Sequence, residues 1–60
     1  MATGIRLITW KDGRITMEKT AKETATLEDI MEIAECEVFG GYADYAQVWV
    51  DNNMYAEYEA

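Results

Sequence analysis

Carboxylates are the most numerous reactive side chains in this sequence, with twelve Asp and Glu among 60 residues, so acid–base chemistry is considered first. General acid–base catalysis requires a carboxyl group held in a cleft with a shifted pKa. The densest acidic run falls in a predicted helix, where we expect its side chains on a convex, solvated face. The chain also lacks the His and Ser of a nucleophilic triad. The sequence therefore predicts no catalytic residue, and we expect a protein that is not an enzyme.

Metal and cofactor chemistry has few candidate ligands. One cysteine, Cys36, excludes an internal disulfide, and without His a zinc site lacks its usual ligands. A catalytic thiolate needs a cation or base beside it, whereas Glu35 and Glu37 flank this thiol. Residues 51–53 resemble the start of a calcium loop, but the glycine and the distal glutamate of such a loop are missing. We predict no metal and no cofactor.

The charge is divided unevenly along the chain. The net charge is −7; residues 1–22 hold all five basic residues and two acids, a sum of +3, and residues 23–60 hold ten acids and no base, a sum of −10. Such a field repels nucleic-acid phosphates and anionic membranes, and it attracts a protein with a basic surface. No signal peptide or long apolar run is present, and a lone thiol suits a reducing compartment, so we expect a cytoplasmic protein.

The N-terminal part predicts a β-hairpin. Residues 5–10 and 14–19 are rich in β-branched and apolar side chains, and Asp12-Gly13 between them is the strongest short hairpin signal. A two-residue turn pairs Trp10 with Ile15 and Ile8 with Met17. We expect these four side chains to face the core, leaving Leu7, Thr9, Thr16 and Glu18 on the other face. A three-residue loop would shift the register and exchange some of these faces.

A single amphipathic helix follows the polar connection of residues 20–25. Thr26 and Asp29 have the spacing of a capping box, and Gly40 or Gly41 supplies the left-handed residue that ends the helix. The apolar stripe consists of Leu27, Ile30, Met31, Ala34 and Val38, with Ile33 on its shoulder. The far side carries three glutamates, Glu28, Glu32 and Glu35, which we name the acidic ridge.

The C-terminal part predicts one further strand, and either a fourth strand or an extended tail. Residues 45–51 alternate, so that Ala46, Val48 and Val50 face the core and Tyr45 and Trp49 form an outer, aromatic face. Residues 51–53 are of types typical of a turn, and we expect residues 54–60 to form either an edge strand or a tail packed over the domain. We expect one domain, residues 1–60, of the α+β class: a small antiparallel sheet with one helix on one face, in the order ββαβ with a possible fourth C-terminal strand.

The acidic ridge is the sharper candidate for function. Glu28 and Glu32 are a like-charge i,i+4 pair, and Glu35 and Glu37 lie where the helix dipole disfavours anions, so together they cost about 1 kcal/mol. A surface that reduces stability is a candidate contact surface. Aromatic residues interleaved with acids after the helix form the second candidate, because Tyr and Trp are common interface anchors. The predicted partner-binding residues are Glu28, Glu32, Glu35, Asp44, Tyr45, Trp49 and Asp51.

The pattern of elements resembles small early proteins of bacteriophages. A hairpin, the segment ATLEDIMEIAE (residues 25–35), an aromatic–glycine pair and a Val-rich strand follow one another over residues 5–51, as in the host RNA polymerase inhibitor of short-tailed coliphages. That resemblance implies that Glu28, Glu32 and Glu35 engage a basic part of a polymerase. Phage inhibitors of uracil-DNA glycosylase are similar in their small sheet, one helix and acidity. Anti-CRISPR proteins are similar in size and charge.

These observations lead to two hypotheses of different kinds. In the first, the chain is a small acidic, phage-like inhibitor that mimics DNA by charge and occupies a basic, nucleic-acid-binding surface of a host protein, such as an RNA polymerase, a DNA glycosylase or a CRISPR effector, in the host cytoplasm. It would not bind nucleic acid or membrane directly. In the second, it is a structural or assembly module whose homodimer forms through Tyr45, Trp49 and the C-terminal segment.

Overall fold

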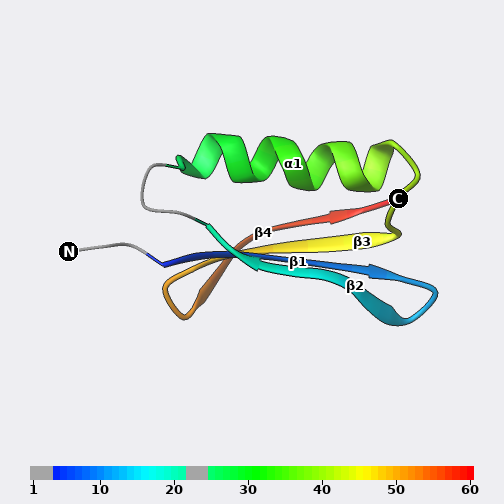
Figure 1. The fold of residues 1–60 in the computed structure, drawn as a ribbon, viewed down its shortest axis with the longest axis horizontal. Coiled ribbons are helices and arrows are strands. Elements are labelled where there is room, and N and C mark those ends of the chain that lie inside the picture. Colours follow the sequence, from blue (N-terminus) through cyan, green and yellow to red (C-terminus); the bar gives the residue numbers. More distant parts are fainter. Residues whose placement is uncertain (1–3, 22–24) are drawn as a thin grey trace.

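One helix packs on one face of a four-stranded antiparallel sheet (Figure 1). The structure is a computed structural model, and it describes residues 4–21 and 25–60. The elements are β1 (Ile5–Lys11), β2 (Arg14–Thr20), α1 (Leu27–Phe39), β3 (Tyr45–Val50) and β4 (Asn53–Glu59). The strands lie in the order β2-β1-β3-β4, and every neighbouring pair is antiparallel. The predicted α+β class is confirmed, and the C-terminal segment is a strand.

The Asp12-Gly13 turn forms as the sequence predicts. Both residues have positive φ, 53° and 80°, as a type I′ turn requires, and Lys11 pairs with Arg14. Trp10 pairs with Ile15, but a β-bulge then shifts the register between Thr9 and Trp10. Beyond the bulge Thr9 pairs with Met17 and Ile8 with Glu18, so the predicted pairing of Ile8 with Met17 is wrong.

The core face of β1 is the opposite of the predicted one. Leu7 and Thr9 are buried under the helix, 2% and 1% exposed, whereas Ile15 is 55% exposed. The reason is the pairing with β3, which sets Leu7 beside Val48 and Thr9 beside Ala46, the buried side chains of that strand. The bulge keeps Met17 packed against the core, and Thr9 satisfies its hydroxyl at 2.7 Å from that of Thr16.

Helix α1 begins and ends with the predicted caps. Thr26 is the N-cap and forms the full capping box with Asp29, and Gly41, with φ of 87°, is the left-handed residue after the helix. Residues 22–24 of the predicted connection lie outside the described residues. In the part of the chain that the structure describes, no helix is long and apolar enough to cross a membrane.

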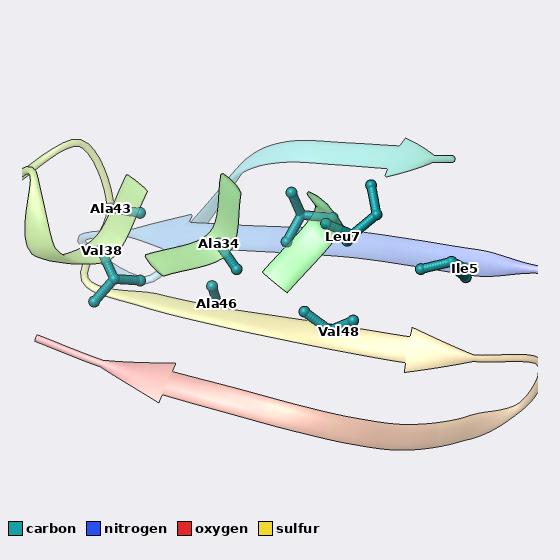
Figure 2. Close-up of a cluster of buried hydrophobic side chains, with 8 residues drawn as sticks. Ile5, Leu7, Ala34, Val38, Ala43, Ala46 and Val48 are labelled. Carbon is teal, nitrogen blue, oxygen red and sulfur yellow. The ribbon is translucent and has the colours of Figure 1, made fainter. Parts of the chain in front are cut away.

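Small side chains form the contact between α1 and the sheet. Ala34 of the helix and Ala46 of β3 are both fully buried, and Figure 2 shows them beside one another, with Val38 and Val48 close by. Leu7 and Ile5 of β1 extend the cluster along the helix. The predicted stripe is confirmed, since Ile30, Ala34 and Val38 are buried and Leu27 and Met31 pack against them. Two alanines facing one another allow the helix axis to approach β3 closely.

Substitution of Leu7 and of Ile15 distinguishes the observed core face from the predicted one. We expect Leu7→Ala to lower the free energy of unfolding by about 2–5 kcal/mol, because it leaves a cavity in the core. Ile15→Ala should lower it by less than about 1 kcal/mol, because that side chain is mostly in water. Urea denaturation followed by tryptophan fluorescence measures both. A larger loss for Ile15→Ala than for Leu7→Ala would contradict this assignment of the core.

Candidate functional site

The acidic ridge lies on the flank of α1 that faces β4. Glu28, Glu32 and Glu35 are all exposed. Burial, and after it the neighbouring Glu35 carboxylate, raises the pKa of Tyr58 on β4 above its usual value. Phe39, which continues the ridge at the end of the helix, packs edge-on against the same tyrosine with ring centroids 6.4 Å apart. The ridge is therefore tied to β4 at its C-terminal end.

The opposite flank of α1 faces β2. Ile30 and Ile33 line a groove together with Leu7 of β1 and Lys19 of β2. Ile33, predicted on the shoulder of the apolar stripe, is 43% exposed at this groove. The two flanks of the helix therefore differ: the flank above β2 carries Ile33 with Glu37 one turn later, and the flank towards β4 carries the three glutamates of the acidic ridge.

The fold converts the uneven charge of the sequence into two unlike edges. The described basic residues, Arg6, Lys11, Arg14 and Lys19, all belong to β1 and β2. The β4 strand has no basic residue, and it carries Glu57 and Glu59, whose side chains lie on the sheet face away from the ridge. We name the five carboxylates of Glu28, Glu32, Glu35, Glu57 and Glu59 the acidic side. Within residues 4–21 and 25–60, the one ion pair joins Lys11 to Asp44 at 3.6 Å, so no described cation neutralises the acidic side.

Asp44 and Asp51, two of the predicted partner-binding residues, bind the protein's own backbone. Asp44 accepts a hydrogen bond from the Asp12 amide at 2.9 Å and lies beside Lys11, and these contacts lower the pKa of its carboxyl group despite some desolvation. Asp51, with φ of 57°, accepts from the Gly4 amide at 3.1 Å. The first aspartate joins the β1–β2 turn to the entry of β3, and the second joins the β3–β4 turn to the start of β1. A partner-binding role for them stays a prediction.

Tyr45 and Trp49 lie on the sheet face opposite the helix, as the alternation of β3 predicts. They belong to a hydrogen-bonded row, in which the Trp49 indole donates to Gln47 and the Gln47 amide donates to the Tyr45 hydroxyl, each at 3.0 Å. The Tyr45 hydroxyl in turn donates to Glu57, and this bond is the main cause that raises the pKa of Tyr45. We name this surface the open sheet face.

Other side chains on the open sheet face pack around that row. Trp10 lies 5.3 Å from Tyr45 between ring centroids, and the Arg6 guanidinium stacks over Trp49 at 5.9 Å. Ile8 is 8% exposed on this side, beside Gln47. The aromatic surface is therefore held in one arrangement before any partner binds.

The structure separates the predicted site into parts. The three ridge glutamates lie together, whereas Tyr45 and Trp49 lie across the sheet from the helix, so the helix acids and these rings do not form one continuous acidic, aromatic surface. The predicted partner-binding residues include none of Gln47, Glu57 and Arg6, which organise the open sheet face, although Glu57 is one of the acids interleaved with the aromatic residues in the sequence. Alternation along β3 and β4 placed Gln47 beside the aromatic rings, but the pairing of Gln47 with Glu57 depends on the register of two strands.

The hollow on the outward side of α1 is lined by Asp29, Glu32, Ile33, Cys36 and Glu37, all from one helix, so it is a surface depression and not a cleft between elements. Among residues 4–21 and 25–60, no three metal-binding side chains lie close enough together to hold a metal ion. Cys36 is exposed on the same helix. The described surface presents fixed negative charge on the acidic side and ordered aromatic rings on the open sheet face.

Comparison with models of protein families, with curated proteins and with solved structures found no match to this chain.

The lowered pKa of Asp44 predicts a contribution to acid stability that Asp44→Asn removes. A carboxyl group whose pKa is lower in the folded than in the unfolded protein stabilises the fold above its unfolded value, 3.8, and this stability is lost as the pH falls through the folded value. Urea midpoints measured between pH 2.5 and pH 6 should fall less steeply below 3.8 for Asp44→Asn than for the wild type. Thr20→Ala on β2, which changes no titratable group, is the control and should keep the wild-type slope. Identical slopes for all three proteins would contradict the role of Asp44.

Proposed function

We propose that this protein is a small acidic inhibitor that docks its acidic side on a basic, nucleic-acid-binding surface of another protein. The observation that carries the proposal is the position of the acidic ridge: three exposed glutamates on the β4 flank of α1, without a described basic neighbour. Glu57 and Glu59 add two further carboxylates at the same edge of the molecule, on the other face of the sheet. Carboxylates so placed offer the partner what phosphates normally offer, fixed negative charge on a narrow surface.

The composition of the helix supports selection for binding over selection for stability. Its last turn has no basic residue, although a Lys or Arg there would interact favourably with the helix dipole. Glu28 and Glu32 repel one another at i,i+4 spacing. In a domain of this size, whose net stability is about 3–5 kcal/mol, the expense of roughly 1 kcal/mol is substantial.

The kinds of partner follow from the proposal. A nucleic-acid enzyme with a basic groove fits, and the candidates are an RNA polymerase, a DNA glycosylase and a CRISPR effector, as the resemblance to phage proteins implies. The protein would then act in the cytoplasm of a host cell, would bind neither nucleic acid nor membrane itself, and would inhibit by occupancy and not by catalysis.

A homodimer is the second candidate, and the open sheet face favours it. Tryptophan and tyrosine side chains occupy the centre of this face, and Arg6 stacks over Trp49. Trp, Tyr and Arg are the residues most enriched where protein interfaces gain their binding energy. A second copy packed there would bury surface that a domain of 60 residues cannot cover alone.

Removal of the ridge charges should weaken binding to a nucleic-acid-binding partner. We expect the triple variant Glu28→Gln, Glu32→Gln, Glu35→Gln to lose roughly 10-fold in affinity, because each solvent-exposed charge pair contributes up to about 1 kcal/mol. The measurement is fluorescence anisotropy of the labelled protein with purified RNA polymerase, uracil-DNA glycosylase and a CRISPR effector. Duplex DNA and added salt should each displace it.

A matched control variant reaches the same net charge through substitutions on β2, at the opposite edge of the sheet. Glu18→Lys with Thr20→Lys on β2 changes the charge from −7 to −4, since 2 + 1 = 3, as the triple variant also does. This control should bind nearly as tightly as the wild type. Equal losses for both variants would show that only total charge matters, and binding indifferent to DNA would contradict occupancy of a nucleic-acid site.

Light scattering tests the dimer. If the open sheet face is a self-interface, the mass at millimolar concentration should be about twice 6.9 kDa and should return to 6.9 kDa in Trp49→Ala, which removes a central interface ring. Exposed Tyr42→Ala is the control and should leave the mass unchanged. A wild-type monomer at that concentration removes this candidate.

A further inference from the structure

The β4 strand is an edge whose backbone groups are aligned to accept another strand. It is the last strand in the order β2-β1-β3-β4 and pairs with β3 alone. The Ala60 amide donates to the Asp44 carbonyl at 2.9 Å, which continues the β3–β4 register one position beyond the strands. The positions of β4 in phase with Ala60, which are Tyr58 and Ala56, therefore form the hydrogen-bonded pairs with β3. Because such pairs alternate with unbonded ones, Glu57 and Glu59 turn their N–H and C=O groups away from β3.

The side chains at this edge differ between its two faces. Glu57 and Glu59 lie on the open sheet face, where Glu57 accepts from Tyr45. Tyr58 between them lies on the helix side, beside Phe39, which is 69% exposed. The edge therefore has two carboxylates spaced two residues apart on one face and an aromatic surface on the other.

We propose that the β4 edge binds an extended segment of a partner protein, in which basic residues alternate with apolar ones, as a fifth strand of the sheet. The inference rests on the proposed function and names its binding mode. Residues paired across two strands point to the same face. The residues opposite Glu57 and Glu59 would therefore lie beside the carboxylates, and the residue between them would lie beside Tyr58 and Phe39. A segment with Lys or Arg at positions i and i+2 and an apolar residue between them satisfies both faces.

A second copy of this chain fits the edge poorly. Antiparallel pairing of β4 with β4 would bring the carboxylates of Glu57 and Glu59 from two copies together, and like charges placed opposite one another are destabilising. The basic residues of β2, Arg14 and Lys19, lie opposite Lys11 and Leu7, four positions apart along β1. They cannot meet two carboxylates that are two positions apart. Charge therefore selects a strand from another protein.

Two peptides of one composition test the binding mode. The first is an end-capped octapeptide that alternates Arg and Val, and the second has four Arg followed by four Val. We expect the alternating peptide to bind at least roughly 5-fold more tightly, because only it can place a cation beside each carboxylate. Its binding should slow amide hydrogen exchange at Glu57 and Glu59, measured by NMR on the whole chain. Glu57→Gln with Glu59→Gln should remove the preference, whereas Glu18→Gln on β2 should keep it.

Three results would overturn the inference. These are equal binding of the two peptides, binding that leaves the Glu57 and Glu59 amides unprotected, and protection of these amides that rises with protein concentration without peptide, which would identify a second copy. The proposed function is tested separately by the triple ridge variant. If DNA-competed binding to a nucleic-acid enzyme depends on the ridge while the alternating peptide fails, the binding mode is wrong and the function stands. If neither binds, both fail.

Discussion

The contact of one helix with two central strands is the constraint on which the rest of the molecule depends. Ala34 of α1 and Ala46 of β3 are fully buried where the helix meets the strand, and only a small cluster of side chains surrounds them. A larger side chain at either alanine would push the helix from β3, at a typical cost of about 1–3 kcal/mol. Because this single layer of core holds the helix, it also sets which flank faces β4, and hence where the carboxylates of the acidic ridge lie.

That placement of the helix gives the molecule two candidate binding surfaces, the acidic side and the open sheet face. The acidic side combines one flank of α1 with the outer strand of the sheet, while the cations of β1 and β2 remain towards the other edge. The open sheet face is ordered by the row of hydrogen bonds from Trp49 to Glu57. Glu57 belongs to both, since its carboxylate accepts from Tyr45 and its backbone faces outward at the edge. Binding at the β4 edge would therefore perturb the row of hydrogen bonds that joins Trp49, Gln47 and Tyr45 to Glu57.

Much of the fold could be predicted from local patterns, because local chemistry decides it. The Asp12-Gly13 turn, the Thr26–Asp29 capping box and the apolar stripe of α1 depend on neighbours within four residues. The core face of β1 could not be predicted in this way. As a pair, Ile8 and Trp10 are more apolar than Leu7 and Thr9. The sequence pattern alone therefore favours Ile8 and Trp10 as the core-facing residues of β1. The outcome depends on pairing with β3, a strand some forty residues away, whereas the bulge at Thr16 of β2 places Met17 on the core face.

In the candidate site, too, local patterns predict some features, and contacts between distant residues decide the others. Helical periodicity was enough to group Glu28, Glu32 and Glu35, but it could not say that their flank faces β4, since that depends on packing. Asp44 and Asp51 resembled free acids in the sequence and are bound to the backbone amides of Asp12 and Gly4, residues distant in the chain. The role of Gln47 depends on Glu57 being its cross-strand neighbour.

We propose the acidic side as the surface that meets a basic partner. The most direct test of this proposal is an NMR footprint: amide shift changes in the isotope-labelled chain on addition of whichever nucleic-acid-binding protein it binds most tightly. We expect changes concentrated along the acidic ridge of α1 and along β4, and these changes should disappear when duplex DNA displaces the protein. Changes concentrated on β2, or on Trp10 and Trp49 with α1 unaffected, would contradict the proposal.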